Sequence, residues 1–147
     1  PKVKLLERTN IRFLKSENLF SKEDLYPDFV VADLSFISLK LVLKPIEDLL
    51  NKNSFEGIFL IKPQFEVGKE HVSKGGVVKD SKYHLLALNS VINSIKKFNW
   101  EINGLIASPL VGPAGNHEYL IWISKTKLNK FLVNEQFLQK LVKQTLS

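Results

Sequence analysis

The chain has 147 residues, which is enough for one domain with a buried core. It is 44% hydrophobic and 24% charged, as in ordinary folded proteins, and it has no cysteine, which excludes a disulfide framework, a thiolate metal site and a thiol nucleophile. A formal net charge of +6 favours polyanionic partners such as nucleic acids, although a lysine-rich coding bias would produce the same excess.

No targeting, membrane-spanning or metal-binding segment is expected. The N-terminal residues lead into a strand rather than a long apolar stretch, and no apolar run approaches the ~18 residues that span a bilayer. The histidines, His71, His84 and His117, form no His-x-x-x-His pair. We therefore expect a cytoplasmic protein without a membrane partner or a metal ion. The start on Pro1, without methionine, is consistent with the second part of a longer protein.

The first half of the chain predicts alternating strands and helices. Short apolar runs bounded by turn residues indicate strands, and apolar residues three or four positions apart indicate helices. Thr9 or Asn10 can cap the first helical segment, and Ser38 is a good N-cap for the second. The expected elements are a strand over Val3–Glu7, a short helix or irregular segment over Ile11–Phe20, a strand over Asp28–Asp33, a helix over Leu39–Leu50 and a strand over Ile58–Ile61.

The second half predicts a long helix, two strands and a final helix. Ser81 is the expected N-cap of the long helix. The loop between the last two strands is too short for a helical crossover, so these strands should be antiparallel. The expected elements are a helix from Ser81 through Lys97, a strand over Trp100–Ser108, a glycine-proline loop over Pro109–Asn116, a strand over Glu118–Ser124 and an amphipathic helix over Asn134–Leu146.

This order of elements predicts an α/β fold with a doubly wound, mostly parallel sheet. The run Ile58–Ile61 has no polar alternation, which is typical of a strand buried on both faces. The antiparallel last strand should lie between its predecessors in the sheet. Such an arrangement is the hallmark of the Rossmann-like methyltransferase fold, of which this chain would form a part.

Three ionisable residues should meet at one edge of this sheet. Asp33 and Lys62 end parallel strands, and Glu118 begins the reversed strand, so all three lie at the carboxyl edge, where ligands bind in such sheets. Neighbouring strands are roughly 4.8 Å apart, which predicts an acid-base-acid row. A pair of unit charges at ~4 Å is worth on the order of 4 kcal/mol at an effective dielectric of 20, so Lys62 should act as a fixed cation rather than as a base. The alternative is three separate charges on the rim.

A polar loop follows Lys62 and Pro63, with glycines that permit unusual backbone angles at Gly68, Gly75 and Gly76. Lysines on the same edge predict a site for an anionic ligand; they are Lys69, Lys74, Lys79 and Lys82. The alternative is an ordinary turn with lysines that extend from the surface into solvent.

Four motifs resemble those of one enzyme family. They are Asp33–Leu39, Lys62–Gly68, Gly75–Val78 and Gly115–Tyr119, and the triplet Arg8–Asn10 also fits. They look like the motifs of the TlyA family, ribosomal RNA ribose 2′-O-methyltransferases that have an FtsJ-like catalytic domain and are historically labelled haemolysins. The resemblance runs from about Lys2 to Lys125.

The resemblance implies a Lys-Asp-Lys-Glu catalytic tetrad, whose last three members match Asp33, Lys62 and Glu118. In such a site a lysine activates the ribose 2′-hydroxyl, which attacks the methyl group of S-adenosylmethionine in line, and the carboxylates orient the lysines. The implied cofactor-binding residues are Glu7, Asn10, Asp33 and Leu34. The implied partner is ribosomal RNA, with phosphate contacts from Lys69, Lys74, Lys79 and Lys82.

The chain departs from the family pattern at its start. The first tetrad lysine, the glycine-rich methionine-binding loop, the first two family strands and the small N-terminal RNA-binding domain should precede Pro1. Residues 1–147 would thus be the C-terminal part of an FtsJ-like domain, poor in cofactor binding and inactive alone. The absent strands would lie between the first two strands seen here, so Val3–Glu7 should be displaced, paired elsewhere or swapped between two chains of a dimer.

Two other functions remain open from the sequence. One is a non-catalytic RNA-binding or ribosome assembly factor, which would not need Asp33, Lys62 and Glu118. The other is a membrane-active haemolysin, which the absence of a spanning or strongly amphipathic basic helix makes the weakest of the three.

Overall fold

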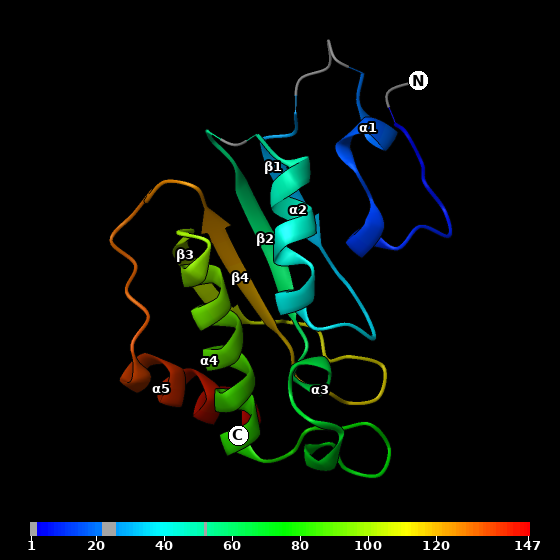
Figure 1. Ribbon diagram of the computed structural model, residues 1–147. Coiled ribbons are helices and arrows are strands. Elements are labelled where there is room, and N and C mark those ends of the chain that lie inside the picture. The colour runs from blue at the N-terminus through cyan, green and yellow to red at the C-terminus, as the bar shows by residue number, and fades with distance from the viewer. Residues whose placement is uncertain (1–2, 22–25, 52) are drawn as a thin grey trace.

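The computed structural model describes residues 3–21, 26–51 and 53–147, and it is organised around a four-stranded sheet (Figure 1). The strands are β1 (Phe29–Ala32), β2 (Glu56–Ile61), β3 (Glu101–Ala107) and β4 (Tyr119–Ser124), in the order β1-β2-β4-β3. β1 and β2 are parallel, and β4 is antiparallel to both of its neighbours. This confirms the predicted α/β fold, with a reversed last strand inserted into a mostly parallel sheet.

The helices follow the predicted order with one exception. They are η1 (Ile11–Phe13), α1 (Ser16–Leu19), η2 (Leu39–Leu41), α2 (Leu43–Leu49), α3 (Pro63–Glu66), η3 (Lys69–His71), α4 (Ser81–Lys97) and α5 (Glu135–Leu146), where η marks a 3₁₀ turn. The exception is that two short ones, α3 and η3, lie in the segment after Lys62, where only a polar loop was predicted. None of the helices in the described ranges is both long enough and apolar enough to cross a bilayer.

The helix predicted over Leu39–Leu50 is divided into η2 and α2. Ser38 caps η2 as expected, since its side chain accepts a hydrogen bond from the backbone N–H of Lys40. A continuous α-helix would need the N–H of Pro45 to bond to the carbonyl of Leu41, and proline has no N–H. The chain therefore forms a 3₁₀ turn first and begins α2 at Leu43, which puts Pro45 in the first turn, where no N–H is needed.

Two other caps were predicted with different success. Asn10 caps η1, where its side chain accepts from the N–H of Arg12, in line with one of the two residues proposed. The cap of α4 is Asp80 rather than Ser81, because the Asp80 side chain accepts from the N–H of Lys82 at 2.9 Å. Ser81 is the first helical residue, so the prediction was wrong by one position.

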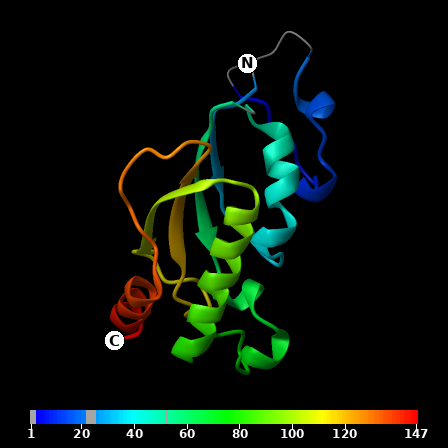
Figure 2. The ribbon, with the colours of Figure 1, turned by 60° about the vertical axis from the view of Figure 1, so that its left-hand side comes forward.

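The hydrophobic core lies between one face of the sheet and helices α2 and α4, which stand in front of the strands in Figure 1 and to one side of them in Figure 2. Phe59 and Ile61 of β2 and Ile121 and Ile123 of β4 are completely buried there. Helix α5 adds Leu138 and Val142 to the same cluster. Burial of such side chains contributes on the order of 1.5–3 kcal/mol each, which holds the layers together.

The opposite face of the sheet is apolar but accessible. Side chains alternate between the two faces along each strand, so every second residue points away from the core. On this second face the exposed apolar residues are Phe29 and Val31 of β1, Ile58 of β2 and Ile106 of β3. Ile58 is 36% exposed. The interpretation of Ile58–Ile61 as a strand buried on both faces was therefore wrong within the described part of the chain, because alternate residues of this run face solvent.

The strand predicted over Val3–Glu7 does not form. These residues belong to no sheet, and Val3 and Leu5 are 78% and 75% exposed. The Nζ atom of Lys4 donates to the carbonyls of Asn18 and Leu19, each at 3.0 Å, which holds the segment beside α1 instead. A strand needs a partner for its backbone groups, and β-propensity alone does not supply one.

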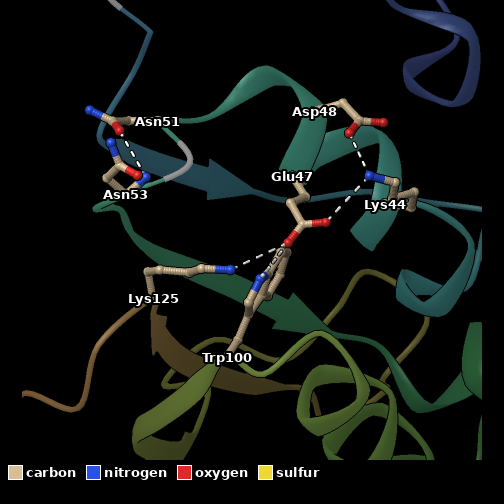
Figure 3. A network of polar contacts seen from close by, with 7 residues as sticks. All are labelled: Lys44, Glu47, Asp48, Asn51, Asn53, Trp100 and Lys125. Carbon is tan, nitrogen blue, oxygen red and sulfur yellow. Dashed lines mark hydrogen bonds and ion pairs between the residues drawn. The ribbon is translucent and has the colours of Figure 1, made fainter.

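A polar network ties the layers together at the end of the sheet away from the carboxyl edge (Figure 3). Glu47 of α2 accepts a hydrogen bond from the Trp100 indole N–H at 3.3 Å, and lies 3.7 Å from the Nζ atom of Lys125. Lys44 pairs with Glu47 at 3.4 Å and with Asp48 at 2.6 Å. The network links α2 to the beginning of β3 and the end of β4, and so fixes the helix on the sheet.

Candidate active site at the carboxyl edge of the sheet

Asp33 and Lys62 form an ion pair at the carboxyl edge of the sheet. Asp33 directly follows β1 and Lys62 directly follows β2, which are parallel neighbours. The Nζ atom of Lys62 lies 2.7 Å from Oδ1 of Asp33 and donates to Oγ of Ser35 at 3.1 Å. The lysine side chain is 13% exposed and the aspartate side chain 67% exposed. The cation is therefore shielded and held in place, while the carboxylate remains open to solvent.

Glu118 immediately precedes the next strand, β4, and lies beside Lys62. In the β2–β4 ladder Ile61 faces Tyr119, so Lys62 and Glu118 occupy the next opposing positions. Glu118 is only 6% exposed, and its Oε1 accepts a hydrogen bond from Nε2 of Gln64 at 3.0 Å. Among the residues described, no ion pair joins Glu118 to Lys62. The structure thus places Asp33, Lys62 and Glu118 on one rim, with direct contact only between the first two.

The residue that binds Glu118, Gln64, had no predicted role. It belongs to the one-turn helix α3, which begins at Pro63 immediately after Lys62. Proline at the first helical position suits a turn that starts directly at the end of a strand. The turn directs the Gln64 side chain back toward β4. The role of Gln64 is evident only from its hydrogen bond to Glu118, which lies 54 positions further along the chain, and no local sequence pattern predicts such a contact.

A buried carboxylate, Glu66, connects two of the motifs. Its Oε2 accepts from the Ser38 hydroxyl at 2.6 Å, and its Oε1 accepts from the backbone N–H of Leu39 at 2.7 Å. Burial raises the pKa of Glu66, and the two hydrogen bonds partly oppose that rise. Glu66 thereby fixes α3, which carries Gln64, against the start of η2, so the segments that follow β1 and β2 form one rigid wall.

A cavity of about 1280 Å³ opens next to this wall. Its lining includes Arg8, Asn10, Leu34, Phe36, Phe65 and Lys69. Of the four residues expected at the cofactor, Asn10 and Leu34 line the cavity, whereas the exposed residues Glu7 and Asp33 lie outside its lining. The cavity combines apolar surface with the cationic side chains of Arg8 and Lys69.

Phe36 is a prominent residue of this cavity that received no role from the sequence. Its backbone has φ of 61°, which is strained for a phenylalanine, and its side chain is 91% exposed. The ring packs against Phe65 with centroids 5.2 Å apart. Phe36 therefore lies at the surface of the cavity and contributes nothing to the core.

The lysines expected at RNA lie on the segment between α3 and α4. Lys69, Lys74 and Lys79 are exposed, and Lys69 also lines the cavity. Lys82, in the first turn of α4, pairs with Asp80 at 3.4 Å and lies over the Tyr83 ring. Gly75 and Gly76 have φ of 106° and 84°, which confirms that this part of the loop uses backbone angles that favour glycine, whereas the same prediction was wrong for Gly68, whose φ of -63° suits any residue.

Comparison with known proteins places this site in a family. Residues 1–125 match the model of the FtsJ-like methyltransferases. The chain is 43% identical over 123 residues to the "16S/23S rRNA (cytidine-2'-O)-methyltransferase TlyA" of Mycobacterium tuberculosis strain H37Rv, a match that covers 84% of this chain and 44% of the relative. It is 38% identical over 125 residues to the "23S rRNA (cytidine-2'-O)-methyltransferase TlyA" of Campylobacter jejuni, covering 84% and 46%.

A further relative and two solved structures have haemolysin names. "Hemolysin A" of Brachyspira hyodysenteriae is 38% identical over 116 residues, covering 78% of this chain and 46% of the relative. Solved structures of proteins provisionally named haemolysins, from Lactococcus lactis and Streptococcus thermophilus, superpose with a TM-score of 0.80 each, at 32% and 30% identity. The Lactococcus lactis match covers 95% of this chain and 64% of that protein's chain, and the Streptococcus thermophilus match covers 93% of this chain and 48% of that protein's chain.

The chain spans less than half the length of the curated relatives that it matches. The match nevertheless includes β1, β2, β3 and β4, and with them Asp33, Lys62 and Glu118. Family model, sequence identity and fold agree: the chain belongs to the FtsJ-like methyltransferase family and is similar, over most of its length, to the TlyA ribosomal RNA 2′-O-methyltransferases.

Proposed function

We propose that the protein, at its full natural length, transfers a methyl group from S-adenosylmethionine to a ribose 2′-hydroxyl of ribosomal RNA. The observation that carries this proposal is the Lys62–Asp33 ion pair of 2.7 Å at the carboxyl edge of the sheet, with Glu118 immediately before the adjacent strand β4 and with Leu34 and Ser35, next to Asp33, lining the cavity. The names of the relatives support cytidine as the nucleoside that receives the methyl group.

Lys62 is the proposed centre of the reaction. Its ammonium group is held by Asp33 and Ser35, so it can donate a hydrogen bond to the ribose 2′-oxygen and stabilise the negative charge that develops there, while the 2′-hydroxyl proton passes to water. Because both partners fix the cation before the substrate binds, little reorganisation is needed during the reaction. Glu118, held by Gln64, supplies a second, buried carboxylate beside Lys62.

The cavity wall fits the adenosine part of S-adenosylmethionine. Leu34, Ile37 and Leu41 offer apolar surface for a purine, and Asn10 offers a polar side chain. We assign cofactor contacts to Asn10 and Leu34, with Asp33 at the rim and Glu7 from the adjoining segment. When bound, the cofactor supplies an electrophilic methyl group on a sulfonium centre. The role of these residues is to place that group in line with the 2′-oxygen.

RNA phosphates would be bound by Lys69, Lys74, Lys79 and Lys82. The first three are exposed and lie on the segment between α3 and α4, which adjoins the cavity. Contacts of this kind provide affinity and orientation without reading the base sequence. Such binding fits the net charge of +6.

The experiment that tests this function is analysis of the product. Ribosomal RNA incubated with the full-length protein and S-adenosylmethionine should gain methyl groups on ribose, which protect the adjacent phosphodiester bond from alkaline cleavage. Methyl groups found only on bases, or RNA that is bound but never methylated, would contradict the proposal. The second result would favour a non-catalytic RNA-binding or assembly factor.

A further inference from the structure

Asn116 connects two segments that lie 38 positions apart. Its Oδ1 accepts a hydrogen bond from the backbone N–H of Val78 at 3.0 Å, and its Nδ2 donates to the carbonyl of Gly76 at 2.7 Å. The residue is only 2% exposed. One side-chain amide therefore pairs with both a donor and an acceptor of the loop, and only a group with both functions can do so.

His84 holds the same loop from a second direction. Its Nε2 lies 2.9 Å from the Val78 carbonyl and its Nδ1 lies 2.9 Å from the Tyr119 hydroxyl. Because a carbonyl only accepts, Nε2 carries the proton and Nδ1 accepts from the Tyr119 O–H. Both backbone groups of Val78 are thus bound, one by Asn116 and one by His84. Asn116 and Tyr119 flank Glu118, so the loop is fixed to the strand end that carries this carboxylate.

The segment held in this way is a closed turn with basic residues, Ser73–Lys79, which we name the basic turn. Gly76 N–H donates to the Ser73 carbonyl at 2.9 Å, and Ser73 N–H donates to the Val77 carbonyl at 2.9 Å. No other atom lies within 4 Å of the position of a Cβ at Gly75 or Gly76, so the tip projects into solvent. Lys74 and Lys79 are exposed on this rigid support.

We propose that Asn116 is a positioning residue for RNA. With His84, it fixes the basic turn relative to Glu118, so that an RNA backbone bound by Lys74 and Lys79 brings its ribose to the Asp33–Lys62–Glu118 rim. This inference rests on the proposed function. A preformed binding surface loses less conformational freedom when the ligand binds, and small misplacements of a substrate are costly for the reaction. A purely structural role would stabilise the fold without a specific effect on RNA.

Asn103 provides a matched control for this test. It is 3% exposed, its Nδ2 donates to Ser124 Oγ at 2.7 Å, and its Oδ1 accepts from the N–H of Leu128 at 3.0 Å. Like Asn116, it is a buried amide that uses one donor and one acceptor, but its contacts lie at the other end of β3 and β4. Asn116→Ala and Asn103→Ala should therefore lower stability to a similar degree.

The experiment compares both variants in the full-length protein with ribosomal RNA as the ligand. Asn116→Ala should speed hydrogen exchange at the Gly76 and Val78 amides and weaken RNA binding by about tenfold, because Lys74 and Lys79 must then be ordered when the RNA binds. Asn103→Ala should leave both unchanged. In a background of Lys74→Ala and Lys79→Ala, the effect of Asn116→Ala on affinity should largely disappear, because the turn then has no lysines to present.

Two results would overturn the inference. One is equal weakening of RNA binding by Asn116→Ala and Asn103→Ala, which would show that only stability matters. The other is an effect of Asn116→Ala that persists in full without the two lysines. Failure of the proposed function can be distinguished from failure of this inference. Methylation of RNA tests the function, whereas RNA affinity and hydrogen exchange test the role of Asn116, and both can be measured even if the wild-type protein binds RNA without methylating it.

Discussion

The Nζ atom of Lys62 lies 2.7 Å from Oδ1 of Asp33, and the two residues end neighbouring parallel strands. The pair is asymmetric, because the lysine side chain is 13% exposed and the aspartate side chain 67%. An ion pair with one exposed partner contributes only about 0–1 kcal/mol to stability, since water screens it. Its main effect is to fix the direction of the Lys62 ammonium group.

Asp33→Asn should therefore reduce activity much more than stability. The variant keeps the shape of the side chain but loses the charge that holds Lys62, so we expect the methyl-transfer rate to fall by roughly 10²-fold, and the free energy of unfolding to change by less than about 1 kcal/mol. Methyl incorporation and urea unfolding measure the two effects. Asp48→Asn, which removes the 2.6 Å partner of Lys44 at the opposite end of the sheet, should leave the rate unchanged. A full rate in Asp33→Asn would refute the role of the pair.

Combined replacement of Lys69, Lys74 and Lys79 by alanine should flatten the salt dependence of RNA binding. Each phosphate contact on single-stranded RNA adds about 0.7 to the slope of log affinity against log salt, so the slope should fall by roughly 2. Filter binding at several salt concentrations provides the measurement. Replacement of Lys96, Lys97 and Lys127, exposed lysines outside the proposed RNA-binding set, removes the same charge and serves as control. Equal slopes for both triple variants would show that the loop has no special role.

Glu66→Gln should destabilise the wall of the cavity. The two carboxylate oxygens accept from Ser38 and Leu39, whereas a glutamine would accept from the Leu39 N–H and donate to the Ser38 hydroxyl, so both charge-assisted hydrogen bonds are lost. The expected loss is about 1–3 kcal/mol in the free energy of unfolding. Glu135→Gln, at an exposed position in the first turn of α5, should cost little. A Glu66→Gln variant as stable as wild type would contradict the buried contacts.

His84 should make stability fall in mild acid. Burial lowers the pKa of His84, and the positive charge of His117 acts in the same direction, while the Val78 carbonyl and Asp80 oppose the shift. A lowered folded-state pKa means that the unfolded chain binds the proton more tightly, so stability is fully present above about pH 6.5 and declines as pH falls below it. Unfolding by urea at pH 7.5 and 5.5 should show the decline in wild type and a smaller one in His84→Gln. If the free energy of unfolding fell equally in wild type and in His84→Gln, the pH dependence would come from other ionisable groups and not from His84.

Much of the fold could be predicted from local patterns. The reversed strand Glu118–Ser124 was predicted from the short loop before it, and β4 is indeed antiparallel and inserted between β2 and β3. The strand ends at Asp33 and Lys62 were visible because an apolar run stops there, and parallel strands bring such ends to one edge. The convergence of Asp33 and Lys62 thus followed from topology rather than from any single residue.

The parts that failed depend on long-range partners. Val3–Glu7 has the composition of a strand, but no strand pairs with it in the described residues, so it stays outside the sheet. Ile58 was interpreted as buried because its run is apolar, yet burial depends on what covers each face. The contacts of Gln64 with Glu118 and of Asn116 with the basic turn join distant positions, and no local pattern reports them.

The most direct test of the account is methyl transfer by Lys62→Ala. Radiolabelled methyl incorporation into ribosomal RNA should be measured for the full-length wild type, for Lys62→Ala and for Lys125→Ala, which removes a lysine that contacts Glu47 at the other end of the sheet. The account predicts that Lys62→Ala loses at least roughly 10²-fold in rate while Lys125→Ala stays close to wild type. Methyl transfer by Lys62→Ala at the wild-type rate would contradict it.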